Sequence, residues 1–224
     1  MVERYDVIGD VHGCLHTLKA LMKKLGYKKN GKHPAGRKLV FVGDVINRGN
    51  HSTETLAFIR DLVENDLALM VRGNHESDWS KRVLSTKKAS KEAVKIAKWL
   101  HDLPYQLLLD DNRLMIVHAA AHTDLVGVMS NKAERWSVRG GRIRGKAWDW
   151  QNAYRGKPFV VAGHTPVAKP RFSKKGGGSV IIDTSASRRK AKDRFTGKKF
   201  AGYLTAFRWP EKEIVKQKTL AKDL

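Results

Sequence analysis

The sequence predicts an α/β fold built as one domain. The chain has 224 residues, of which 41% are hydrophobic, and this is enough apolar material for a single large core. Short buried-type apolar runs recur along it, and helical apolar patterns separate the first three of them. We therefore expect one domain over residues 1–224, with the informative motifs between about residues 5 and 207 and a basic C-terminal tail over 208–224.

The opening of the chain alternates between strand and helix patterns. Strands are expected at the apolar runs 5–8, 39–42 and 67–71, and again at 114–117 and 159–162. Between the first three runs, two sets of apolar residues are spaced to share one helix face: Leu15, Leu18, Met22 and Leu25, and then Leu56, Ile59 and Val63. The order β-α-β-α-β is typical of a sheet with parallel strands.

The middle and end of the chain give weaker patterns. Residues 79–101 are predicted as one basic helix whose inward face carries Ala93, Ile96, Ala97 and Leu100. Strands are expected again at 180–182 and 203–209, and the glycine-rich stretch 174–178 is expected to be a flexible turn.

Composition excludes several classes of protein. No apolar run approaches the roughly 20 residues needed to cross a bilayer, and the first residues lack the pattern of a secretory signal. The single cysteine, Cys14, excludes an intramolecular disulfide framework and an all-cysteine zinc site. We expect a cytoplasmic protein without a membrane partner; the oligomeric state stays open.

Metal-capable side chains follow the predicted strands. They occur in five motifs: Gly9-Asp10-Val11-His12-Gly13, Gly43-Asp44-Val45-Ile46-Asn47-Arg48-Gly49, Gly73-Asn74-His75-Glu76, Val117-His118-Ala119 and Gly163-His164-Thr165-Pro166. Loops at the carboxyl ends of strands converge on one crevice of an α/β sheet, so these residues are expected to meet. A mixture of Asp, Asn and His suits first-row metals better than Ca²⁺, and a bridging carboxylate would create a two-metal site that activates water.

Together and in this order, the five motifs resemble those of the calcineurin-like metallophosphoesterases, and within them the phosphoprotein phosphatase branch that includes symmetrical dinucleoside tetraphosphatases. The resemblance extends from about Tyr5 to Phe207. It implies an αββα sandwich, in which two mixed β-sheets are flanked by helices. It also implies two divalent metal ions, with Mn²⁺ expected first and Fe²⁺, Zn²⁺, Ni²⁺ or Co²⁺ as alternatives.

The resemblance assigns a role to each motif residue. The implied metal ligands are Asp10 and His12 for the first ion, Asp44 as the bridge, and Asn74, His118 and His164 for the second. His75 would be the general acid, and Arg48 and Arg72 would bind phosphate oxygens. A further phosphate-binding arginine is expected from the group Arg135, Arg139, Arg142 and Arg144.

Two positions depart from the pattern of the family. Asn47 stands where protein phosphatases of this branch carry an Asp that favours the charged form of the general-acid imidazole. The neutral amide therefore favours the dinucleoside tetraphosphatase side. The second departure is Asp183-Thr184-Ser185-Ala186, in place of the common Asp-Thr-Gly-Cys, and we expect it to support the site structurally.

The chain is strongly basic, with 44 Lys and Arg against 22 Asp and Glu and a net charge of +22. The excess recurs in segments 79–101, 135–157 and 169–199, which join the motif-bearing strands. Near the crevice they would attract polyanions, and Trp136, Trp148 and Trp150 among the arginines could stack a base. The expected substrate is a nucleoside polyphosphate or an RNA end, with nucleic-acid contact through the basic segments.

Two alternatives remain open at this point. One is a serine/threonine phosphoprotein phosphatase with the same metal chemistry. The other is a catalytically silent, basic nucleic-acid-binding module on the same scaffold. A dinucleotide-binding oxidoreductase is excluded because no Gly-x-Gly-x-x-Gly follows the first strand.

Overall fold

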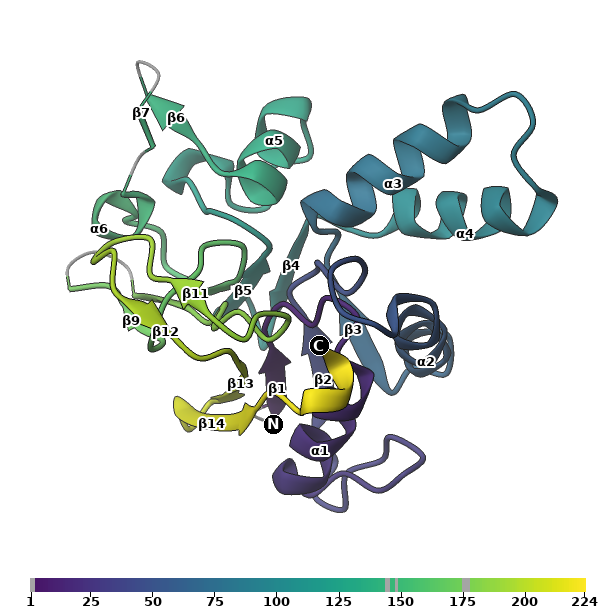
Figure 1. Ribbon diagram of the computed structural model, residues 1–224. Coiled ribbons are helices and arrows are strands. Elements are labelled where there is room, and N and C mark those ends of the chain that lie inside the picture. Colours follow the sequence, from purple (N-terminus) through teal and green to yellow (C-terminus); the bar gives the residue numbers. More distant parts are fainter. Residues whose placement is uncertain (1–2, 144–145, 148, 175–177) are drawn as a thin grey trace.

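The computed structural model describes residues 3–143, 146–147, 149–174 and 178–224. Its core is a pair of five-stranded mixed sheets, ordered β14-β13-β1-β2-β3 and β4-β5-β8-β10-β9. Helices lie on the outer sides of this pair (Figure 1). The predicted αββα arrangement is therefore confirmed, and the turn expected around the glycines falls largely on residues 175–177, outside the described part of the chain.

The bounds of the elements follow the chain. The strands of the first sheet are β1 (Tyr5–Ile8), β2 (Lys38–Phe41), β3 (Ala68–Met70), β13 (Tyr203–Trp209) and β14 (Glu213–Lys218). Those of the second are β4 (Gln106–Leu109), β5 (Leu114–Val117), β8 (Phe159–Ala162), β9 (Arg171–Phe172) and β10 (Ser179–Ile181). Two short hairpins are β6 (Arg142–Ile143) with β7 (Lys146–Ala147), and β11 (Ala191–Lys192) with β12 (Lys199–Phe200).

The helices are α1 (Leu15–Leu25), α2 (Ser52–Glu64), α3 (Asn74–Ser85), α4 (Lys91–Asp102), α5 (Asn131–Arg139) and α6 (Trp150–Ala153). Two short 3₁₀ turns are η1 (Thr123–Leu125) and η2 (Ala221–Asp223). None of the helices in the described residues is long and apolar enough to cross a membrane.

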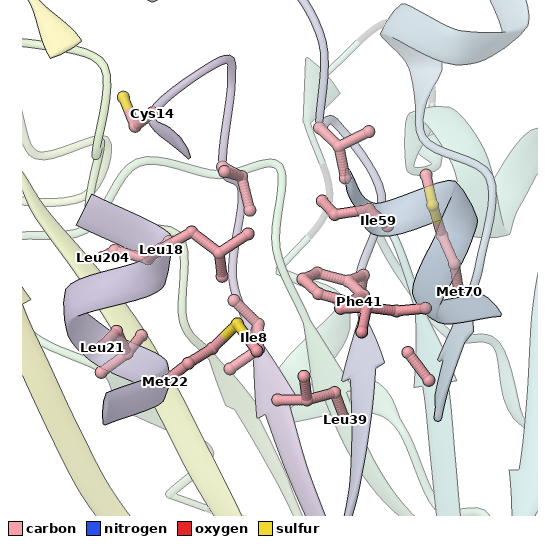
Figure 2. Packing of buried hydrophobic residues seen from close by; sticks show 14 of the residues in the cluster. Ile8, Cys14, Leu18, Leu21, Met22, Leu39, Phe41, Ile59, Met70 and Leu204 are labelled. Atoms are coloured by element: carbon pink, nitrogen blue, oxygen red, sulfur yellow. The ribbon is translucent and has the colours of Figure 1, made fainter. Parts of the chain in front are cut away.

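Alternation along the strands builds two layers of core. In β1, Ile8 faces the helices while Val7 faces the second sheet, because successive strand residues point to opposite sides. Figure 2 shows Leu18 and Met22 of α1 packed toward Ile8 and Leu39. The apolar spacing that predicted α1 is thus the face that covers the first sheet.

The prediction of one helix over 79–101 is wrong. The segment contains the end of α3 and most of α4, separated by residues 86–90. Ser90 begins α4, with its hydroxyl accepting a hydrogen bond from the Ala93 N–H at 3.2 Å, as an N-cap residue does. The two helices form a hairpin that extends away from the sheets (Figure 1).

The C-terminal segment is built into the fold. β14 pairs with β13 along six residue pairs, and Asp223 in η2 is fully buried. Its carboxylate accepts hydrogen bonds from the backbone N–H groups of His16 at 3.1 Å and Thr17 at 2.7 Å. Cys14, at the N-cap of α1, makes no side-chain cap, so a residue from the other end of the chain caps this helix.

Candidate active site

Parallel pairing brings the predicted motifs to one edge of the sandwich. β1, β2 and β3 are mutually parallel, as are β5, β8 and β10. A hydrogen bond joins the ends of the two sheets, because His118 Nδ1 donates to the Val42 carbonyl at 2.9 Å. The side chains proposed as metal ligands therefore meet where the carboxyl ends of these strands converge.

The Asp44 carboxylate lies at the centre of this cluster. Its Oδ2 is 3.6 Å from His12 Nε2 and 3.8 Å from His75 Nε2, while its Oδ1 is 3.4 Å from His118 Nε2. Two groups of potential metal ligands result, Asp44 with His12 and His75, and Asp44 with His118 and His164, each with ligand atoms within 4.8 Å of one another. One carboxylate is thus shared by two adjacent groups.

The imidazole rings are oriented as metal-binding rings usually are. His12 Nδ1 donates to the Ile46 carbonyl at 2.9 Å, and His118 Nδ1 bonds in the same way to Val42. In the neutral rings each Nε2 is therefore an acceptor directed at Asp44, which is itself an acceptor. A cation between these atoms satisfies both, so the donor set fits a metal.

The second group contains a similar convergence of acceptors. Asn74 Oδ1 lies 3.0 Å from His118 Nε2 and 2.9 Å from His164 Nδ1, and these two ring nitrogens are 3.1 Å apart. Nitrogen and amide-oxygen ligands of this kind suit a first-row divalent ion.

Buried charge around Asp44 points the same way. Burial, followed by the neighbouring Asp183 carboxylate, raises the pKa of Asp10 above its usual value, and burial raises the pKa of Asp183 to about 6. Although burial opposes a charge on His118, Asp44 raises the pKa of this imidazole to about 10, so without a cation a proton takes the place between the two acceptors. Several buried carboxylates thus compete for too little positive charge, which a divalent cation would supply.

The side chains expected to act on substrate lie at the exposed mouth of the cluster. Asn47 Nδ2 donates to His75 Nδ1 at 2.8 Å, which directs His75 Nε2 toward Asp44. The Arg48 guanidinium lies between two rings, with Nη1 2.9 Å from His12 Nε2 and Nη2 3.3 Å from His75 Nε2. Burial, followed by the charge of Arg48, lowers the pKa of His75 despite the opposing effect of Asp44.

The backbone of the site is held in an unusual conformation. Five of the motif residues have positive φ values, namely His12, Asp44, Asn47, Arg48 and His164, and side-chain-bearing residues seldom adopt this region. The loops after β2 and β3 also run so close that a Cβ on Gly43 would lie 2.5 Å from the Gly73 nitrogen. Glycine at both positions lets Asp44 approach His75.

Glu76 is a residue of the site that sequence reasoning left without a role. Fully buried, its carboxylate accepts from the backbone N–H groups of Gly73, Asp44 and Val45 at 3.0, 2.7 and 2.9 Å. Burial, followed by the Asp44 charge, raises the pKa of Glu76 to about 7. Glu76 thus caps α3 and fixes the loop that presents Asp44; the Gly-Asn-His-Glu motif was the available signal.

The arginines expected to bind phosphate occupy different environments. Arg72 is buried; its guanidinium bonds to the His101 carbonyl and pairs with Glu134 at 2.9 Å, so the structure does not bring it to Arg48. Arg139 pairs with Asp78 of α3, and its charge contributes to the lowered pKa of His164, after burial and His118. Arg135 is exposed, whereas the Arg142 and Arg144 side chains lie outside the described part of the structure.

Of the tryptophans expected to stack a base, the two that the structure describes lie in different environments. Trp150 is buried in the core beneath the second sheet. Trp136 is half-buried and meets the His122 ring edge-on at 5.1 Å. Trp148 lies outside the described residues.

Comparison with known proteins agrees with this geometry. The family model for the calcineurin-like phosphoesterases matches residues 4–197. The chain belongs to this family. It is 34% identical to the asymmetrical bis(5'-nucleosyl)-tetraphosphatase PrpE of Anoxybacillus flavithermus, over 94% of this chain and 92% of that protein. The same protein of Geobacillus thermodenitrificans is 36% identical, with the same coverage.

Solved structures share the fold. A crystal structure provisionally named as a diadenosine tetraphosphatase superposes with a TM-score of 0.73 at 20% identity, covering 99% of this chain and 96% of the other. The resemblance drawn from the motifs is confirmed, and the chain is a phosphoester hydrolase. Membership of this family also implies divalent metal ions, for which the two groups around Asp44 provide ligands.

Proposed function

We propose that the protein is a two-metal hydrolase of nucleoside polyphosphates. The observation that carries this proposal is the Asp44 carboxylate, whose two oxygens face His12 on one side and His118 on the other. Divalent ions bound there would activate water for attack on phosphorus and stabilise charge on the phosphate. The mixed N and O ligands suit first-row divalent ions, and we propose Mn²⁺ first, as the family resemblance implies, with Fe²⁺, Zn²⁺, Ni²⁺ and Co²⁺ as alternatives.

The proposed ligands of the first ion are Asp10 and His12, and those of the second are Asn74, His118 and His164. His12 and His118 are oriented for this role by the carbonyl partners of their Nδ1 atoms. Asp10 is held at the site by the His164 N–H, which lies 3.1 Å from both carboxylate oxygens.

The remaining side chains are proposed to handle phosphate and the leaving group. The exposed Arg48 guanidinium offers two parallel donors to phosphate oxygens. His75 in its charged form donates the Nε2 proton to the leaving oxygen. The Asn47 amide beside Nδ1 orients the ring, and its oxygen accepts from Nδ1–H once that nitrogen is protonated. We assign a structural role to Arg72, because its guanidinium is already bound to the Glu134 carboxylate and the His101 carbonyl. We propose Arg139 as the further phosphate-binding arginine.

The preferred substrate is a dinucleoside tetraphosphate. Relatives that match almost the whole chain at 34–36% identity are named asymmetrical tetraphosphatases. Their name favours asymmetrical cleavage, which would convert diadenosine tetraphosphate to ATP and AMP; the symmetrical tetraphosphatases of the branch that the motifs resemble would release two ADP. Asn47 supports this substrate over a phosphoprotein, since an Asp would favour the imidazolium more strongly.

Product analysis tests this proposal. The Mn²⁺-loaded protein is incubated separately with diadenosine tetraphosphate, a phosphopeptide and an RNA with a terminal phosphate. Formation of ATP and AMP is the expected result. Formation of two ADP would show symmetrical cleavage and contradict the proposed position of cleavage. Preferential release of phosphate from the peptide or the RNA would replace the proposed substrate. No turnover with any metal would favour the silent binding module.

A nucleic-acid contact is a separate proposal, supported by the α3–α4 hairpin. All seven of its basic residues, Lys81, Arg82, Lys87, Lys88, Lys91, Lys95 and Lys98, are exposed. Phosphate contacts release counterions, so binding of RNA should weaken steeply as salt increases. A flat salt response would contradict the contact.

A further inference from the structure

A pocket of about 550 Å³ opens beside the proposed metal ligand His164. Part of its lining is the loop after β8, with His164 and Thr165, and another part is the wall formed by the segment that carries β11 and β12. That wall contributes Arg188, Lys192 and Arg194. A volume of this size is typical of a small-molecule site.

The cationic wall is fixed to the loop that carries His164. The Arg194 N–H donates to the Pro166 carbonyl at 2.9 Å, and the Asp193 carboxylate accepts from the Ala168 N–H at 2.7 Å. The same carboxylate accepts from the backbone N–H groups of Phe195 and Thr196 at 3.0 and 2.8 Å. The pocket therefore has a defined position relative to the proposed metal site.

The basic side chains that line this pocket have no ion-pair partners among the described residues. Arg188, Lys192 and Arg194 are exposed, and none of them forms an ion pair with an acidic group of the described residues. Asp193, the acidic residue of the lining, is nearly buried and satisfied by backbone donors. Arg72, by contrast, is buried and engaged with Glu134.

We propose that this pocket binds the phosphates of a nucleoside polyphosphate that lie beyond the phosphate being attacked. The inference rests on the proposed function. A chain attacked at the metal edge extends further anionic phosphates, and guanidinium and ammonium groups are their natural partners. The pocket thus makes the enzyme selective for polyphosphates over simple monoesters.

The test compares two triple variants with equal loss of charge. The pocket variant is Arg188→Gln, Lys192→Gln and Arg194→Gln. The control is Arg189→Gln, Lys190→Gln and Lys198→Gln, whose side chains are exposed in the same segment and do not line the pocket. Both are first compared with the wild type by thermal melting. Hydrolysis of diadenosine tetraphosphate and p-nitrophenyl phosphate, and inhibition of the latter by inorganic tripolyphosphate, are then measured with Mn²⁺ at constant ionic strength.

In the pocket variant, we expect the ratio of kcat/KM for the dinucleotide to that for p-nitrophenyl phosphate to fall about tenfold or more, with weaker inhibition by tripolyphosphate by a similar factor. The control should change less than about threefold. Equal losses in both variants would indicate that the overall positive charge of the protein, and not this pocket, attracts the polyphosphate, and would overturn the proposal. No loss in either variant would overturn it as well. If the wild type fails to hydrolyse the dinucleotide, the proposed substrate fails, while tripolyphosphate inhibition still decides whether the pocket binds polyphosphate.

Discussion

The hydrogen bond from Asn47 to His75 predicts how activity depends on pH. The amide N–H donates to Nδ1 at 2.8 Å, which requires a lone pair on Nδ1 and so favours the neutral ring. Burial and Arg48 also lower the pKa of His75, against Asp44. Replacing Asn47 by Asp supplies an acceptor for an Nδ1–H and a negative charge, and both favour the imidazolium.

The size of the effect follows from the distance. For charges about 4 Å apart, the attraction is about 1 kcal/mol in bulk water and about 4 kcal/mol at an effective dielectric constant of about 20. One pKa unit corresponds to about 1.4 kcal/mol. The His75 side chain is 21% exposed, so solvent screens part of this attraction, and we expect Asn47→Asp to raise its pKa by about one to two units.

The assay is kcat as a function of pH, measured with Mn²⁺ for the wild type, Asn47→Asp and Asn47→Ala. A general acid loses activity as pH rises through its pKa, so a higher pKa of His75 moves the alkaline limb to higher pH in Asn47→Asp. Asn47→Ala removes the amide donor without adding a negative charge, so its alkaline limb should move to higher pH by less than that of Asn47→Asp. An alkaline limb that coincides in Asn47→Asp and the wild type would refute the assigned role of His75 or its coupling to position 47.

Substitutions at three further positions give separate results. Asp44→Asn should lower kcat about a thousandfold or more, equivalent to about 4 kcal/mol of activation free energy, and lower the bound metal measured by elemental analysis; full activity would disprove the bridge. Glu76→Gln should lower the free energy of unfolding by about 2 kcal/mol, because its amide group faces backbone donors; an unchanged denaturation midpoint would contradict this. Asp223→Ala should cost about 1 kcal/mol in the same measurement through loss of the α1 cap, whereas Asp223→Asn, which keeps an acceptor, should cost less; equal losses would argue against capping.

The parts of the fold that the sequence predicted are those with local periodicity. Strands over 114–117, 159–162 and 203–209 agree with β5, β8 and β13 residue for residue. Their apolar runs are bounded by turn residues, which makes their ends visible. The prediction of one helix over 79–101 failed because residues on both sides of the break at 86–90 are good helix formers. The cap at Ser90 is a weaker sequence signal than the charge pattern around it.

Contacts between residues that are far apart in the sequence could not be predicted, because no local sequence pattern indicates them. Asp223 caps α1 through Thr17, which lies 206 positions earlier, and it occurs in a basic segment that the sequence presented as a tail. Glu76 is four residues past Arg72, yet its partners include the loop after β2. Both residues satisfy buried backbone donors, a requirement that only the assembled fold reveals.

The basic charge shows why a count of cations is less informative than their pairing. Arg37, buried between Asp6 and Glu211, holds the first sheet to the turn after β13. By contrast, Arg188 and Lys192 have no acidic partner in the described chain and face a pocket beside His164. Cations paired within the fold are not available to a ligand, whereas unpaired cations next to the reacting edge remain available to an anionic ligand. If the pocket binds polyphosphate as proposed, the charge that bears on substrate choice is the small fraction that the fold leaves unneutralised at this edge.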